Sequence, residues 1–130
     1  MAVLGLDPGT RKCGFAVVTA LGAPAAAQGI VPIEALAVRL AEIVAAHPVE
    51  LAAIGRGTNA AAVVEAVAAL GLPYALIDER ETTLRARARF FVDHPPRGWR
   101  RLVPRGMLLP DRPIDDYAAL LIAERHLAGV

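Results

Sequence analysis

The sequence predicts an α/β protein with a mixed five-stranded sheet flanked by helices. Short apolar runs bounded by glycine, proline and polar residues predict strands, and longer stretches with apolar residues at helical spacing predict helices. Three strands come first in succession, and the remaining two each alternate with a helix. Three antiparallel strands followed by strand-helix-strand units are typical of a mixed sheet with helices on its faces.

The first three strands are separated by turn residues. Residues 3–6 form an apolar run that ends at Asp7, and residues 14–18 form the returning strand after a Pro-Gly-Thr turn. A third strand is expected over residues 28–33, after the glycine- and proline-containing turn at 22–24. This arrangement places Asp7 where the first strand leaves the core. A carboxylate at such a place is costly unless it is paired.

Helices and strands alternate in the rest of the chain, marked by capping residues and by the glycine or proline that ends a helix. The predicted elements are a helix over 34–46, a strand over 51–54, a helix from Thr58 or Asn59 to 70, a strand over 74–77, a helix over 82–91 and a last helix over 113–127. Residues 93–113 have no clear periodicity, which predicts either a mobile loop or an irregular segment that wraps around the protein. The order of elements suggests the ribonuclease H-like architecture as one of several options.

Length and composition restrict the class of protein. A chain of 130 residues predicts one domain over 1–130, and 55% hydrophobic with 21% charged residues argues against disorder. No apolar run approaches the roughly 20 residues of a membrane span, and Asp7 interrupts the first run too early for a signal peptide. The single cysteine, Cys13, excludes an internal disulfide and fits a reducing compartment. We therefore expect a cytoplasmic protein without a membrane partner.

Arginines concentrate in one segment of the chain. Nine arginines and no lysine lie from Arg80 to Arg112, against Glu81, Asp93 and Asp111, so the local balance is nine minus three, or +6. Because arginine forks bind phosphate bidentately, the segment predicts nucleic-acid contacts. The candidates are Arg80, Arg85, Arg97, Arg100, Arg101 and Arg105. The alternative is a solvated surface whose arginines reflect a GC-rich genome.

Acidic residues stand at the ends of three predicted elements. Asp7 ends the first strand, Asp78 and Glu79 end the fifth, and Asp115 and Asp116 begin the last helix. Carboxylates about 4 Å apart repel by about 4 kcal/mol at an effective dielectric near 20, so such a cluster raises its pKa values or binds a cation. Oxygen ligands favour Mg²⁺ or Mn²⁺, which can activate water against a phosphodiester. The alternatives are aspartates that only complement a helix N-terminus and a surface ion pair at the strand end.

Three segments resemble, in order, the motifs of the YqgF family, whose members are also called RuvX or Holliday junction resolvase-like proteins. They are LGLDPGTRKCGFAVV, IDERETT and IDDYAALLIA, which begin at residues 4, 77 and 114. The resemblance implies a ribonuclease H-like fold, a divalent-metal-dependent nuclease activity and processing of the small-subunit ribosomal RNA precursor. Residue by residue, it implies Asp7, Glu79 and Asp115 as catalytic, metal-binding acids. Asp116 is a further candidate ligand, and Asp78 competes with Glu79.

One departure from the junction resolvases concerns the fourth strand. There a catalytic acid stands at the strand end, whereas this chain has Gly55 and Arg56, so an identical mechanism is not expected. We expect a nuclease acting on structured or single-stranded RNA, with branched or single-stranded DNA as further candidate substrates. The alternative is a non-catalytic nucleic-acid-binding protein that keeps the fold. An actin-like ATPase is disfavoured, because that architecture needs two such domains, and a homodimer stays open.

Overall fold

A computed structural model of the chain describes residues 2–57, 59–78, 82–98, 102, 110 and 112–129, with side chains from residue 85 onward in the helix that begins at Thr82. The order of elements is the predicted one. The elements are β1 (Ala2–Pro8), β2 (Lys12–Val18), β3 (Ala27–Pro32), the short 3-10 helix η1 (Ile33–Ala35), α1 (Leu36–Ala46), β4 (Val49–Gly55), α2 (Ala60–Ala69), β5 (Tyr74–Ile77), α3 (Thr82–Asp93) and α4 (Asp115–Leu127).

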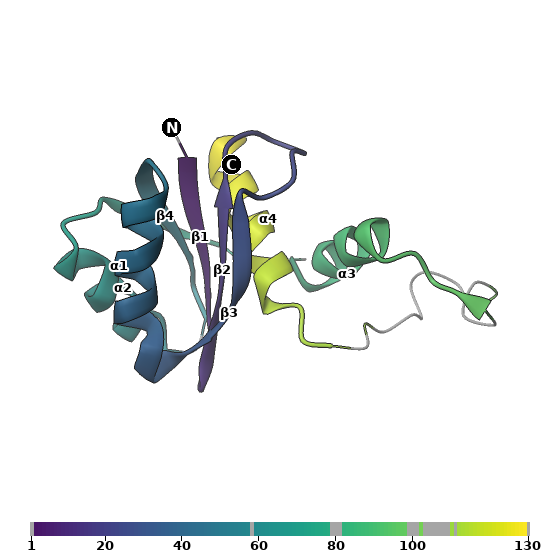
Figure 1. Cartoon of the computed structure of the whole chain (residues 1–130), viewed down its shortest axis with the longest axis horizontal. Helices are drawn as coiled ribbons and strands as arrows, with labels where there is room; N and C mark the ends of the chain where they lie inside the picture. Colours follow the sequence, from purple (N-terminus) through teal and green to yellow (C-terminus); the bar gives the residue numbers. More distant parts are fainter. Residues whose placement is uncertain are drawn as a thin grey trace.

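The five strands form one mixed sheet in the order β3-β2-β1-β4-β5. β1 pairs antiparallel with β2 and parallel with β4, and β4 pairs parallel with β5. The mixed sheet predicted from the sequence is therefore confirmed. Because β1, β4 and β5 run in one direction, their carboxyl ends meet at one edge of the sheet, next to the β1–β2 turn (Figure 1). In open α/β sheets such an edge is where ligands bind.

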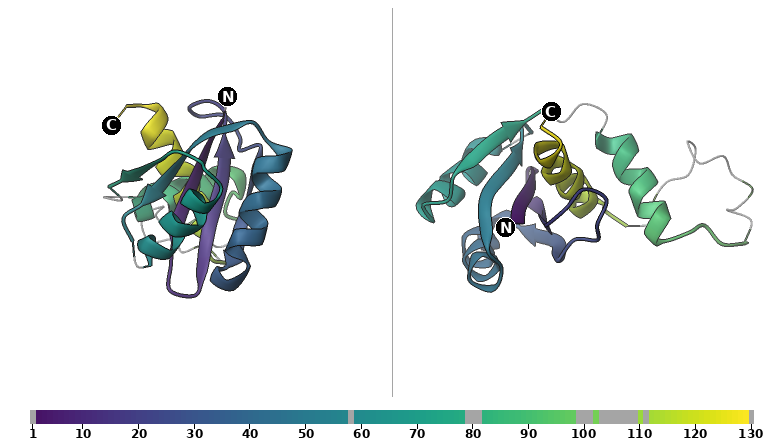
Figure 2. Two further views of the ribbon diagram at one scale, coloured as in Figure 1. Left: turned by 90° about the vertical axis from the view of Figure 1, so that its left-hand side faces the viewer. Right: turned by 90° about the horizontal axis from the view of Figure 1, so that it is seen from above.

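The two faces of the sheet carry different helices. Ala2, Leu4 and Leu6 of β1 pack with buried residues of α1 and α2, whereas Val3 belongs to the core on the other face, which α4 covers. Successive residues of a strand point to opposite faces, so the odd-numbered residues of β1 face α4. Figure 2 shows the same layers from two further directions, with α1 and α2 on one side and α4 on the other.

The ends of the helices follow local sequence signals. Pro48 comes just after α1, and Gly71 ends α2 with a positive φ of 70°, which favours glycine. Asn59 occupies the N-cap position of α2 but has a left-handed conformation, and its side chain makes no capping hydrogen bond. Its predicted capping role is therefore wrong in this respect, while Thr58, the alternative cap, lies outside the described residues.

The helix α3 lies on the outer side of α4, away from the sheet (Figure 1). Arg89 of α3 donates to Glu124 of α4 at 3.0 Å and to the carbonyl of Ala23 at 3.3 Å. The backbone N–H of Gly22 donates to the same Glu124 carboxylate at 2.8 Å. These contacts tie α3, α4 and the β2–β3 loop together. Among the described residues, no helix has both the length and the apolar character that crossing a membrane requires.

Candidate active site at the carboxyl end of β1

Asp7 lies at the carboxyl end of β1, in the last residue pair but one of the β1–β2 ladder. Its cross-strand partner is Gly14 of β2. As an odd-numbered residue it faces α4, and it is half-buried. A strand that ends in this way presents a carboxylate on the α4 face, at the edge where β1, β4 and β5 end.

The helix α4 lies so close to this ladder that its backbone touches the glycines of β1 and β2. A Cβ atom at Gly14 would overlap the carbonyl group of Asp115, and one at Gly5 would overlap the carbonyl of Ala119. Both glycines are needed because no side chain fits between helix and sheet. Gly14 is also the partner of Asp7. The N-terminus of α4 is therefore brought to the strand end that carries Asp7.

The charges of Asp7 and Asp115 both contribute to the raised pKa of the Cys13 thiol. The thiol is fully buried on the other face of β2, and its pKa is raised from 9.0 to about 12. Burial is the main cause, the negative charge of Asp7 adds to it, a backbone hydrogen bond from Asp7 opposes it, and the charge of Asp115 raises it further. Asp7 and Asp115 thus share one neighbourhood. The thiol stays protonated at neutral pH, so it is not an activated nucleophile, and it lies on the face of the sheet away from Asp115.

Lys12 contacts the first of the two helix aspartates. Its Nζ lies 3.7 Å from Oδ2 of Asp115, and the two side chains are 45% and 35% exposed. Lys12 begins β2 and has the same parity as Gly14, so it faces α4 as well. The sequence interpretation did not single it out. The signal was present, because Lys12 is the only lysine beside 13 arginines among the 14 basic residues.

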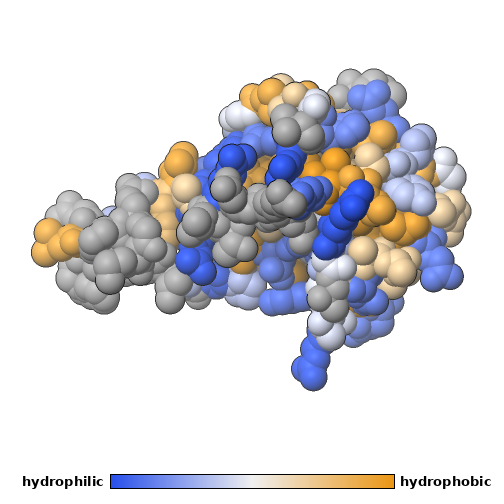
Figure 3. Space-filling model, turned by 180° about the vertical axis from the view of Figure 1, so that it is seen from behind, coloured by the Kyte–Doolittle hydropathy of each residue, from blue (hydrophilic) through white to orange (hydrophobic). Residues whose placement is uncertain are grey.

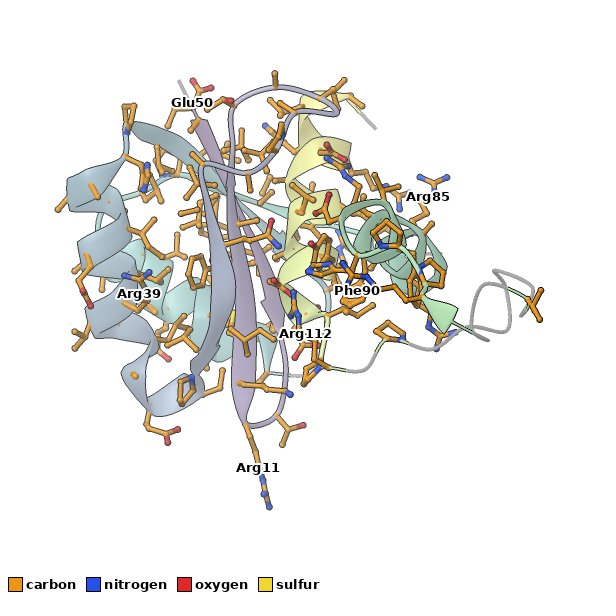
Figure 4. All side chains as sticks on the ribbon, turned by 45° about the vertical axis from the view of Figure 1, so that its right-hand side comes forward. Arg11, Arg39, Glu50, Arg85, Phe90 and Arg112 are labelled. Atoms are coloured by element: carbon orange, nitrogen blue, oxygen red, sulfur yellow. The ribbon has the colours of Figure 1, made fainter. Side chains whose placement is uncertain are left out.

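Asp116 points to a different group of side chains. It is 4% exposed, and its Oδ2 accepts from Nε2 of Gln28 on β3 at 2.9 Å. Arg112 donates to both carboxylate oxygens at 3.3 Å. The Arg112 guanidinium also lies over the rings of Phe90 and Tyr117, 5.4 and 5.6 Å from their centroids (Figure 4). The adjacent aspartates of α4 therefore contact different side chains: Asp115 contacts Lys12, whereas Asp116 contacts Gln28 and Arg112.

The strand end of β5 carries the third predicted acid. Glu79 lies outside the described residues, and Asp78 follows β5 as an exposed residue. Ile77 packs with the α4 face, and its carbonyl accepts from the backbone N–H of Arg56 at 3.1 Å.

With this geometry established, the chain can be compared with known proteins. No protein-family model matches the sequence, and no curated protein matches it. Among solved structures, Thermus thermophilus RuvC superimposes with a TM-score of 0.63 at 19% identity, over 98% of this chain and 93% of that chain. T. thermophilus RuvC in complex with a Holliday junction substrate gives 0.64 at 22% identity, over 98% and 92%. This chain has the RuvC fold. The expected ribonuclease H-like architecture is thereby confirmed, and at these identities the likeness concerns the fold.

Within this RuvC fold, two of the six predicted nucleic-acid contacts are described. Arg85 is exposed on α3 (Figure 4), and Arg97 is exposed and lines a cavity of about 340 Å³ with Phe90 and His94. The other predicted contacts lie outside the described residues; they are Arg80, Arg100, Arg101 and Arg105. Seen from behind, hydrophilic side chains lie across the middle of the molecule (Figure 3). Two further arginines of the basic segment, Arg89 and Arg112, instead pair with acids of α4.

The two described candidate ligands, Asp7 and Asp115, offer carboxylate oxygens, which are the ligands that hard divalent cations take in proteins. Asp7 and Asp115 come from β1 and α4, whereas the Cys13 thiol is buried in the core on the opposite face of the sheet. In the part of the chain that the structure describes, no group of three or more His, Cys, Asp or Glu side chains is placed to hold a metal ion. The third predicted acid, Glu79, is not in that part. The residues that are described fit a hard divalent cation.

Proposed function

We propose that the chain is a divalent-metal-dependent nuclease that hydrolyses phosphodiester bonds, with Asp7, Glu79 and Asp115 as the acids that bind Mg²⁺ or Mn²⁺. The observation that carries the proposal is the position of α4 on Gly14, the strand partner of Asp7. It brings a helix aspartate to a strand aspartate at the edge where sheets of this kind bind ligands. Two carboxylates held together in this way favour a cation between them.

The chain's own residues would hold the cations and limit the reorganisation that the reaction needs. When bound, divalent cations supply a Lewis acid and lower the pKa of water. Asp7 and Asp115 would hold the cations from rigid elements, since one lies on a strand within the sheet and the other on a helix packed on glycines of that sheet. Water adds its oxygen to phosphorus, the bond from phosphorus to one ribose or deoxyribose oxygen breaks, and that oxygen leaves with a proton as a hydroxyl group. Fixed carboxylates limit the reorganisation that this step needs.

Between the two aspartates of α4, the ligand we assign is Asp115. Asp116 is buried, and both of its oxygens already accept hydrogen bonds from Arg112 or Gln28. A cation would have to replace those partners. Asp115 has one contact with Lys12 at 3.7 Å and lies over the Asp7–Gly14 pair. Asp116 would then hold the start of α4 in place.

For the substrate, we propose structured or single-stranded RNA, in particular the small-subunit ribosomal RNA precursor, in a cytoplasmic setting. The resemblance of the three motifs to the YqgF family supports this choice. Branched or single-stranded DNA is the second candidate, because T. thermophilus RuvC, which shares the fold, forms a complex with a Holliday junction substrate. The arginines from Arg80 to Arg105 would bind phosphates without regard to sequence. A homodimer is a further proposal that sedimentation can test.

The deciding experiment uses purified protein with labelled RNA, single-stranded DNA and a four-way junction, with Mg²⁺, with Mn²⁺ and with chelator. We expect cleavage of at least one substrate that requires the metal. Retention of binding without cleavage, in every metal, would favour the non-catalytic alternative. The substrate with the highest kcat/KM would identify the class of nucleic acid.

A further inference from the structure

Lys12 is exceptional in the composition of this chain. It is the only lysine, and the other 13 basic residues of the Lys and Arg total of 14 are arginines. A genome bias toward arginine codons accounts for the arginines but not for one retained lysine. Lysine differs from arginine in carrying a compact point charge on a flexible stem rather than a planar fork. A site that must hold one oxygen at a time, and release it, suits lysine better.

The position of Lys12 also favours a role at the candidate site, because its side chain contacts Asp115. It faces α4 at the open end of the Asp7–Gly14 ladder, and its Nζ lies 3.7 Å from Oδ2 of Asp115. Its neighbour Arg11 lies in the same turn but points away from the body of the protein (Figure 4). Of these two adjacent cations, Lys12 is the one with a described contact to Asp115. An exposed ion pair of this kind contributes little stability, so stability alone does not account for it.

Lys12 and a divalent cation would compete for the same carboxylate. A lysine ammonium next to Asp115 offsets its charge while no metal is bound. When a divalent cation takes Asp115, Lys12 loses that partner and is repelled by the incoming charge. A flexible stem then lets the ammonium move to the nearest anion. In a nuclease that anion is a phosphate of the substrate.

We propose that Lys12 is the phosphate-binding cation of the site, held by Asp115 in the metal-free protein and released to the substrate when the metal binds. The inference rests on the proposed nuclease function. It makes nucleic-acid binding at this site depend on prior metal binding. It also assigns a role to Lys12, the only lysine of the chain.

The first test measures metal binding alone. Calorimetric titration with Mn²⁺, without nucleic acid, compares the parent with Lys12→Met and with Arg11→Met as the matched control. We expect Lys12→Met to bind Mn²⁺ about two- to fivefold more tightly, because a competing exposed ion pair is removed. Arg11→Met should bind like the parent. Equal affinity in the parent and Lys12→Met would overturn the proposal.

The second test uses the fact that the chain has one lysine. Reductive methylation with ¹³C-formaldehyde, which keeps the charge, gives one lysine NMR signal beside that of the N-terminal amine. We expect this signal to shift on addition of Mg²⁺ in the parent and to stay in place in Asp115→Asn. It should shift again when single-stranded nucleic acid is added to the metal-loaded protein. A lysine signal whose chemical shift does not change when Mg²⁺ is added to the parent would overturn the proposal.

The third test measures cleavage at saturating metal. Lys12→Met should lower kcat/KM about ten- to hundredfold, the range of a lost hydrogen bond to a charged group. Lys12→Arg should recover part of this loss, and Arg11→Met should stay within about threefold of the parent. Tighter metal binding together with slower cleavage is the expected signature, and an unchanged kcat/KM would overturn it. If the parent cleaves nothing, the nuclease proposal fails. The calorimetric and NMR measurements still show whether Lys12 pairs with Asp115 and is released when metal binds.

Discussion

Gly14 of β2 lies directly beneath the backbone of Asp115, so closely that a Cβ atom at residue 14 would overlap the Asp115 carbonyl. Since Gly14 is the cross-strand partner of Asp7, this contact brings the N-terminus of α4 to the strand end that carries Asp7. The arrangement depends on the absence of a side chain at one position. It predicts that a single methyl group there damages the site.

Gly14→Ala should lower the free energy of unfolding by about 1–3 kcal/mol, the usual cost of overpacking, and should reduce metal-dependent cleavage by displacing Asp115. Urea unfolding and the cleavage assay measure the two effects. Gly29→Ala is the control, because a Cβ there would meet only the ring edge of Phe15 at 3.1 Å. Equal cleavage by Gly14→Ala and the parent would contradict the account of how α4 positions the site.

The two aspartates that begin α4 should respond differently to replacement. Asp116→Asn should lower stability by about 1–3 kcal/mol, because it breaks a buried contact with Arg112 and Gln28. Asp115→Asn should leave the melting temperature within a few degrees and remove cleavage. Thermal unfolding and kcat measured on both variants distinguish them. The reverse pattern would move the ligand to Asp116.

Glu79→Gln should cost far more activity than Asp78→Asn. Ile77 packs on the α4 face. Because alternate residues of an extended strand share a face, we expect the residue two positions after Ile77 rather than its immediate neighbour to act with Asp115. Single-turnover cleavage rates of the two variants at saturating Mn²⁺ test this. A larger loss with Asp78→Asn would show that the backbone changes register after β5.

Burial of Cys13 makes the free energy of unfolding depend on pH in the alkaline range. The pKa of the thiol is about 12 in the folded state against an ordinary 9.0, so the folded protein keeps a proton that the unfolded chain loses. The free energy of unfolding should be highest below pH 9 and fall between pH 9 and 12, by at most about 1.4 kcal/mol per pH unit. Tyr117, whose pKa burial and the bond to Asp93 raise to about 12, adds to the fall above pH 10.

Urea unfolding at pH 7.5, 8.5 and 9.5 measures this slope, with Cys13→Ala as the control. The slope between pH 8.5 and 9.5 should be shallower in Cys13→Ala. Iodoacetamide should label Cys13 at pH 9 only in urea. Rapid labelling of the folded protein would show that the thiol is not protected as described.

Much of the fold follows from the sequence because its signals are local. The run from Val3 to Leu6 and the Pro-Gly-Thr turn predict β1 and its hairpin, which extends to Ala2–Pro8. The helix expected over 34–46 is resolved into η1 and α1. The last helix begins at Asp115, so both aspartates lie in its first turn, as expected.

The arrangement of the site could not be predicted from the sequence, because it depends on how α4 packs on the sheet. Strand parity places Asp7 on one face, but only the contact of α4 with Gly5 and Gly14 shows which helix covers it. Sequence could not separate Asp115 from Asp116, because a helix turns by about 100° per residue and its orientation is set by packing. The pairing of Lys12 with Asp115 joins residues that are far apart in the sequence.

The central claim is that Asp7 helps to bind the catalytic metal, and Asp7→Asn tests it most directly. Asparagine keeps the size of the side chain and removes the charge. We expect metal-dependent cleavage to disappear while the melting temperature is unchanged or higher, because a repelling carboxylate is removed beside Asp115. Glu42→Gln, an exposed carboxylate on α1 at the opposite face, should cleave like the parent. Cleavage by Asp7→Asn at the parent's rate, after purification that excludes contaminating nuclease, would contradict the account.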